Sequence, residues 1–189
     1  MLRVVLAAAL LCAVALAHSR PQFALRDTSN VVHSPAEWNG KKAIVVFFTT
    51  TDCPLSNNEV PEMNRTRRDY ESRGVAFYAA QADTTIAEAD VLQHTGEYQF
   101  SFPVLFDPHQ ILVKLTGATT IPEAAVLSSD GTLLYLGRID NRVEDFNIRR
   151  AEPTKFDLRE ALDAVLAGRP VANPRTKAFG CAINPVQQR

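Results

Sequence analysis

The segment "KKAIVVFFTTTDCPLSNNEVPEM", residues 41–63, joins an apolar run to a polar stretch through one cysteine and one proline. Residues 43–48 are all apolar and rich in β-branched and aromatic side chains, which predicts a strand covered on both faces. From Ser56 onward, apolar residues recur at helical spacing among charged ones, and Gly74 ends the pattern. The sequence therefore predicts a buried strand followed by a long helix, with Cys53 at the junction.

A cysteine just before a helix has distinctive chemistry. The free backbone N–H groups and the partial positive charge at a helix amino end favour the thiolate, which is the nucleophilic form. Cys53 stands at such a position, so we expect a reactive nucleophile. The residues alone leave two alternatives open, namely an inert half-buried thiol and a partner in a structural disulfide.

The rest of the chain alternates between strand and helix patterns. They predict strands at 74–80 and 102–106, a helix opened by the capping-box pair Thr85 and Glu88, a helix from Asp107 to Gly117, a hairpin around Asp130-Gly131 and a last helix at 154–168. Pro61 is expected to bend the first helix. Strand–helix–strand crossovers imply parallel pairing, and the closing hairpin adds antiparallel strands. The pattern predicts an α/β fold, a mixed central sheet with helices on both faces.

The two ends of the chain differ from this core. Residues 1–17 carry a positive start, an apolar stretch and the small-x-small sequence Ala15-Leu16-Ala17, which predicts a cleaved secretory signal peptide. We expect a secreted or periplasmic protein with no membrane insertion after cleavage. Residues 18–168 would form one domain, and residues 169–189 a Pro-rich, irregular C-terminal tail that carries Cys181.

The composition limits the classes of partner. The 189 residues include 20 Lys and Arg against 21 Asp and Glu, a formal net charge of −1, and no basic stripe is present. Nucleic acid is therefore not an expected partner, and no cofactor is expected. Of the three cysteines, Cys12 lies in the predicted signal peptide. The other two are too few to form the disulfide framework of a small secreted scaffold.

Several of these features together resemble a known family. A strand ending in "TTTDCP" (49–54), a Pro-containing helix, "TTIPEA" (119–124) and a terminal hairpin with a helix resemble the thioredoxin fold. More narrowly, they are similar to the redoxin group, which holds the alkyl hydroperoxide reductase/thiol-specific antioxidant family and the periplasmic thiol–disulfide oxidoreductases. The resemblance covers about residues 23–168.

The resemblance implies roles for individual residues. Cys53 corresponds to the reactive cysteine, and Ile121-Pro122 to a cis-proline that faces it. Thr50 matches the threonine of the peroxiredoxin pattern P-x-x-x-T-x-x-C. The chain also departs from these patterns. Val46 replaces the proline, Ser56 replaces the second cysteine of the thioredoxin C-x-x-C, and no clear counterpart of the peroxiredoxin arginine is present.

Cys181 is the predicted resolving partner of Cys53. Several peroxiredoxins resolve with a cysteine in a C-terminal tail, and Gly180 would permit a sharp approach of the chain. A permanent disulfide that pins the tail is the alternative, because closing so long a loop stabilises a fold in the chain-entropy model. Both versions remain open at this stage.

Topology nominates further residues for the site. The strand after Pro122 starts beside Cys53, so the end of the returning strand, residues 138–142, should lie at the same rim. Arg138 could stabilise a thiolate, Glu123 could relay a proton, and Thr50 could hydrogen-bond the Cys53 sulfur. The alternatives are a surface cluster of arginine and aspartate and an ordinary threonine at a strand end.

The expected function is an exported thiol oxidoreductase. Its substrate would be a protein disulfide or dithiol, or a small peroxide, and a reducing partner protein would restore the cysteines. A copper-binding protein is an alternative from a different class, with Cys53, Cys181 and His94 as possible soft ligands. A catalytically silent structural module is another.

Overall fold

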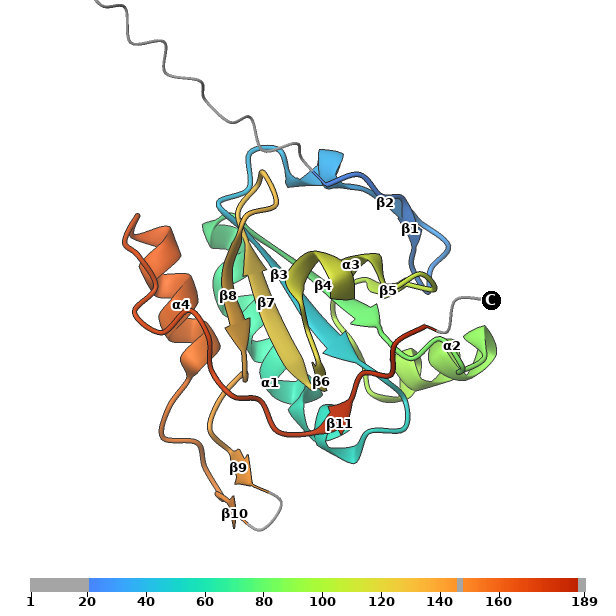
Figure 1. The fold of residues 1–189 in the computed structure, drawn as a ribbon. Coiled ribbons are helices and arrows are strands. Elements are labelled where there is room, and N and C mark those ends of the chain that lie inside the picture. The colour runs from blue at the N-terminus through green and yellow to red at the C-terminus, as the bar shows by residue number, and fades with distance from the viewer. Residues whose placement is uncertain (1–20, 146–147, 187–189) are drawn as a thin grey trace, which may run out of the picture.

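A five-stranded mixed sheet forms the centre of the molecule. The computed structural model describes residues 21–145 and 148–186. The strands lie in the order β5 (Val104–Phe106), β4 (Val75–Gln81), β3 (Ala43–Thr49), β7 (Glu123–Leu127) and β8 (Leu133–Gly137) (Figure 1). β3, β4 and β5 are parallel, whereas β7 and β8 form an antiparallel hairpin against β3. The predicted mixed sheet is confirmed.

The central strand β3 is buried along its whole length because helices cover both faces of the sheet. Its odd-numbered apolar residues, Ala43, Val45 and Phe47, pack with α1 (Pro54–Tyr70), α4 (Asp157–Leu166) and one residue of α2 (Glu88–Glu97). The even-numbered residues Ile44, Val46 and Phe48 pack with α3 (Ile111–Thr116) and the amino-terminal segment. This alternation is the period of two that a strand imposes.

Short elements surround this core. They are β1 (Leu25–Arg26), β2 (Val32–His33), the 3-10 helices η1 (Pro35–Trp38) and η2 (Glu71–Arg73), β6 (Thr120–Ile121), β9 (Val143–Asp145), β10 (Ile148–Arg149) and β11 (Cys181–Ala182). β11 pairs antiparallel with β6, so the expectation of a tail without regular structure is wrong. Upstream, Leu136 of β8 donates its backbone N–H to the carbonyl of Pro174 in the tail and accepts the N–H of Thr176. The pairing partner of each tail segment lies far away in sequence, which local patterns do not register.

The starts of α1 and α2 differ from the expectation. α1 begins at Pro54, two residues earlier than Ser56, which makes Cys53 its N-cap residue. The capping box of Thr85 and Glu88 does not form. The Thr85 hydroxyl donates instead to Asp83, and α2 begins at Glu88 itself.

The predicted signal peptide and the possibility of a membrane-spanning helix concern the ends of the chain and its helices. The predicted signal peptide, residues 1–17, lies outside the described residues. No helix within 21–145 and 148–186 has both the length and the apolar character that a bilayer crossing requires.

The side chain of Asp107, which precedes α3 in the sequence, hydrogen-bonds the start of that helix. The helix begins at Ile111 and not at Pro108, yet the carboxylate of Asp107 accepts the backbone N–H groups of Ile111 (2.6 Å) and Leu112 (2.8 Å). These are two of the donors that a helix start leaves without partners.

We predict that Asp107→Ala lowers the free energy of unfolding by about 1–2 kcal/mol, because two backbone donors at the start of α3 lose their acceptor. Asp107→Asn keeps one acceptor oxygen and should lose less. Urea unfolding of both variants measures the difference. Equal losses for the two substitutions would contradict the capping role.

Candidate active site

Cys53 lies at the start of α1 with its thiol turned inward. Its carbonyl accepts the first helical hydrogen bond, from the N–H of Asn57 (3.0 Å), and Pro54 follows at the position where a missing N–H costs nothing. The side chain is 0% exposed. Its Sγ donates to the carbonyl oxygen of Ile121 at 3.3 Å, and the Ile121–Pro122 peptide bond is cis, as the resemblance to redoxins implies. The thiol therefore sits against the loop between β6 and β7.

Cys181 reaches the same loop from the C-terminal tail. In the β6–β11 pair, Cys181 lies opposite Ile121 and Ala182 opposite Thr120. Ile121 thus contacts both cysteines, one through its carbonyl and one through its strand pairing. Both cysteines are free thiols. Burial raises the pKa of Cys181 to about 11, and a hydrogen bond with Cys53 and the charge of Cys53 add to the rise.

Gly180 allows the tail to approach this closely. A Cβ atom at this position would lie 1.8 Å from the carbonyl oxygen of Ile121 and 2.6 Å from its carbonyl carbon. Only glycine fits against the loop without displacing backbone atoms. The close pairing of Cys181 with Ile121 therefore depends on the residue before it.

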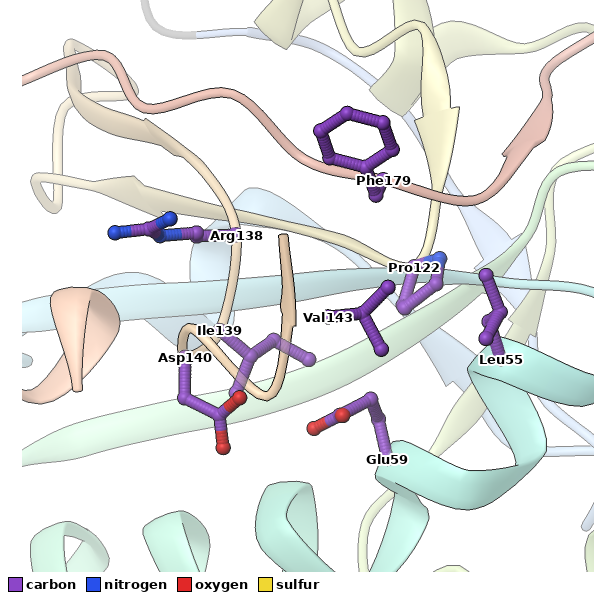
Figure 2. Close-up of a pocket in the computed structure, with 8 residues that line it drawn as sticks. All are labelled: Leu55, Glu59, Pro122, Arg138, Ile139, Asp140, Val143 and Phe179. Carbon is purple, nitrogen blue, oxygen red and sulfur yellow. The ribbon is translucent and has the colours of Figure 1, made fainter. Parts of the chain in front are cut away.

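A small pocket of about 20 Å³ lies beside Pro122. Its lining residues are Leu55, Glu59, Pro122, Arg138, Ile139, Asp140, Val143 and Phe179 (Figure 2). The end of the β8 segment therefore returns to the rim near Pro122, as topology predicts. Figure 2 shows the carboxyl groups of Glu59 and Asp140 on the same side of this pocket. One oxygen of each carboxyl is buried without a hydrogen-bond partner in the described structure.

Glu59 is the functional candidate that sequence reasoning missed. Burial and then the negative charge of Asp140 raise its pKa to about 7, although Arg142 lies 3.9 Å away and opposes the rise. Burial also raises the pKa of Asp140, although the backbone N–H of Arg142 donates to its carboxylate and opposes the rise. The available signal was helical spacing, since Glu59 follows Ser56 by three residues and so lies on the buried side of α1.

Arg138 lies at the rim but contacts α4. Its Nε is 2.7 Å from a carboxylate oxygen of Asp157, and this hydrogen bond raises the pKa of Arg138. In Figure 2 its guanidinium points away from Pro122. In place of the predicted contact with the Cys53 thiolate, Arg138 anchors the first residue of α4 to the end of β8.

Thr50 and Glu123 also differ from their predicted contacts. The Thr50 hydroxyl is buried and has no hydrogen-bond partner in the described residues, so it does not bond the Cys53 sulfur. The Glu123 carboxylate accepts the N–H groups of Thr119 (2.9 Å) and Thr120 (3.3 Å). Burial raises the Glu123 pKa, and these two N–H groups oppose the rise. Glu123 thereby holds the loop that precedes Ile121.

This arrangement agrees with a family comparison. A redoxin family profile matches residues 17–152, a span that contains Cys53 and Pro122. The chain belongs to the redoxin family. The matched span ends before α4 and the tail with Cys181.

Individual proteins are also similar to this redoxin in sequence and in structure. Thiol-disulfide oxidoreductase ResA from Bacillus thuringiensis is 26% identical over 114 residues, which are 60% of this chain and 64% of ResA. The chain therefore spans less than two thirds of the length of that relative. An uncharacterized conserved protein from Geobacillus kaustophilus has a similar structure, with a TM-score of 0.78 and 26% identity over 90% of this chain and 92% of that one.

The fold is shared more widely. A thiol:disulfide interchange protein of the thioredoxin family from Chlorobium tepidum aligns with a TM-score of 0.54 and 19% identity, over 79% of this chain and 94% of that one. At this identity the likeness concerns the fold alone. The predicted thioredoxin-like fold is confirmed.

The copper site that the sequence left open is not assembled in the described part of this redoxin. There, no group of three or more His, Cys, Asp or Glu side chains is arranged to hold a metal. His94 Nε2 lies 2.8 Å from the side-chain oxygen of Asn57, and burial lowers the pKa of His94. His94 therefore links α2 to α1 and does not complete a site with Cys53 and Cys181.

The tight approach at Gly180 gives a testable consequence. Gly180→Ala should separate β11 from β6 and expose Cys53, so the rate of Cys53 alkylation by iodoacetamide should rise at least about tenfold. Gly96→Ala is the matched control, because a Cβ there meets no atom within 4 Å. Peptide mapping by mass spectrometry measures the rate. An unchanged rate with an intact fold would show that β11 does not cover the thiol.

The pKa of Glu59 predicts a pH-dependent stability. A carboxyl whose pKa is about 7 in the folded chain and 4.5 ordinarily binds more protons when folded, so stability falls as the pH rises through this window. Glu59→Gln removes this cost. As the pH rises from 4.5 to 8, the free energy of unfolding of the variant should therefore increase relative to that of the wild type, by up to about 3 kcal/mol. Urea unfolding across this range tests it, with exposed Glu160→Gln as the control. A constant difference between wild type and Glu59→Gln would contradict the assignment.

Proposed function

We propose that the chain is an exported thiol–disulfide oxidoreductase in which Cys53 is the nucleophile and Cys181 the resolving cysteine. The observation that carries the proposal is the shared contact with Ile121, whose carbonyl accepts the Cys53 thiol while its strand pairs with Cys181. Two thiols next to one another at a helix start are suited to alternate between dithiol and disulfide. The similarity to ResA supports the same reaction class.

The reaction begins at Cys53. Its thiolate attacks one sulfur of a substrate disulfide, the substrate S–S bond breaks, and the other substrate sulfur leaves as a thiolate. Cys181 then loses its proton and attacks Cys53, which releases the second substrate sulfur. The products are a Cys53–Cys181 disulfide and a substrate dithiol, and the two cysteine protons end on the substrate. A reducing partner dithiol returns the protein to its starting state.

The raised pKa of Cys181 supports the proposed order of the two cysteines. With a pKa of about 11, Cys181 keeps its proton near neutral pH and is not the first nucleophile. Cys53 has the helix start, which stabilises a thiolate. Glu59 titrates near neutral pH and lines the pocket at Pro122, so it is placed to take up and return a proton during resolution.

Export is part of the proposal. It rests on the signal pattern in residues 1–17, which would carry the protein to an oxidising compartment. In such a compartment the protein would need a dedicated reductant to act as a reductase.

A peroxide is the second candidate substrate. The buried Thr50 hydroxyl, which has no partner in the described residues, stands three positions before Cys53 and is available to hydrogen-bond a peroxide oxygen. In that reaction the Cys53 thiolate attacks one oxygen, water leaves, and the sulfenic acid condenses with Cys181 to the same disulfide with loss of a second water. Arg138 does not assist, since Asp157 holds it.

Cysteine variants test the proposal. Reduced wild-type protein should reduce a disulfide-bonded peptide through a Cys53–Cys181 bond, and Cys53→Ser should abolish the reaction. Cys181→Ser should still attack but remain a mixed disulfide, with turnover at least about tenfold lower. Peptide thiol release and mass spectrometry measure both steps, and consumption of hydrogen peroxide in parallel decides between the two substrates.

Three results would count against this function. Unchanged turnover of Cys181→Ser would remove its resolving role. A Cys53–Cys181 bond with a reduction potential below about −300 mV would make it a structural disulfide. Tight, stoichiometric Cu(I) binding without any exchange would favour the copper-binding alternative.

A further inference from the structure

A second, larger cleft continues from the pocket at Pro122. It has a volume of about 280 Å³ and is lined by Leu55, Asn58, Glu59, Arg142, Val143, Arg149 and Arg150. Leu55, Glu59 and Val143 also line the pocket at Pro122, so the two hollows adjoin. The cleft therefore leads away from the cysteines between the first turns of α1 and the β9–β10 hairpin.

Three arginines from one hairpin region dominate the charge of this cleft. Arg142 donates to the carbonyl of Ala151 and has only a long contact, 3.9 Å, with Glu59. Arg150 pairs with Glu144 through one nitrogen, but its buried Nε has no partner in the described structure. The side chain of Arg149 is exposed and makes no ion pair within 21–145 and 148–186. The cleft thus keeps unused guanidinium donors.

The opposite side of α1 carries the reverse charge. There a cleft of about 370 Å³ lies between the start of α1 and α2, and its charged lining includes Asp52, Asp90 and Glu97. Figure 1 places α2 and the β9–β10 hairpin on opposite sides of α1. The arginine-lined cleft and the acidic cleft therefore flank the start of α1, where Cys53 lies.

We propose that the cleft of Arg142, Arg149 and Arg150 binds carboxylate side chains of an acidic segment next to the partner protein's reactive cysteine. The inference rests on the proposed function, and it names the class of partner. Arginine donors match carboxylates in paired hydrogen bonds. The cleft adjoins the pocket at Pro122, so a bound segment would present a neighbouring cysteine to Cys53.

The lining also favours a carboxylate over a phosphate group. Glu59 forms part of the wall, and its carboxylate would repel a doubly charged phosphate more strongly than a singly charged carboxylate. The small volume suits one or two amino-acid side chains. An acidic peptide segment is therefore the occupant.

Matched peptides test the proposal on the full-length protein. Three disulfide-bonded peptides would differ only in two residues beside the cysteine, which are Glu, Gln or Lys. Wild-type protein should reduce the Glu peptide with a kcat/KM about tenfold above that of the Lys peptide. Arg149→Glu should remove or reverse this preference and change the Gln peptide by less than about twofold. High salt should also reduce the preference.

Arg68→Glu is the matched control, since it reverses an exposed arginine near the far end of α1. It should leave the preference unchanged. If wild type reduces all three peptides equally, or if Arg149→Glu and Arg68→Glu act alike, the acidic-partner proposal is overturned while the redox function stands.

A binding measurement separates this proposal from the redox function. Fluorescence anisotropy with peptides that carry serine in place of cysteine requires no exchange. Tighter binding of the Glu peptide than of the Lys peptide, lost in Arg149→Glu, supports the cleft even if no peptide is reduced. Equal binding of the two peptides overturns it.

Discussion

The structure depends on the loop that ends in Ile121 and Pro122. Ile121 accepts the Cys53 thiol through its carbonyl and pairs with Cys181 through its backbone. The loop is itself fixed because β7 starts immediately after Pro122 and pairs with β3, which ends four residues before Cys53. One stretch of sheet therefore sets the distance between two cysteines that are far apart in sequence.

Burial and local electrostatics act in opposite directions around this loop. Burial raises the pKa of Cys181 and of Glu59, whereas the guanidinium of Arg142 opposes the rise at Glu59. The paired carboxyls of Glu59 and Asp140 cost stability when both are ionised, and Arg142 offsets part of this cost through its backbone N–H, which donates to Asp140 (2.7 Å), and its side chain, 3.9 Å from Glu59. A fold selected for stability alone would place apolar residues there. The cost is consistent with a site that must exchange protons near neutral pH.

The sequence predicts the sheet and the position of Cys53 well because both follow from local patterns. The apolar run of β3, the turn at Asp130-Gly131 and the apolar face of α4 each lie within a few consecutive residues. The β11–β6 and β9–β10 pairs were missed because two- and three-residue strands have no detectable period. The contacts of Arg138 were missed for a related reason. Topology brings it to the rim, but the competing carboxylate of Asp157 comes from a helix that sequence cannot place at that distance.

The burial of Cys53 adds a requirement to any reaction with a partner. A substrate sulfur reaches a fully buried thiol only after part of its cover moves. The tail is held on both sides of Cys181. Near Thr176, backbone bonds to Leu136 and bonds of the Thr176 hydroxyl to Tyr135 and Arg138 fix the chain. After Cys181, Ile183 donates to the carbonyl of Thr119, and the Gln110 side chain bonds the backbone of Asn184 and Val186. Opening between these anchors would expose Cys53 and keep Cys181 tethered nearby, so that it returns to resolve the mixed disulfide at a high effective concentration.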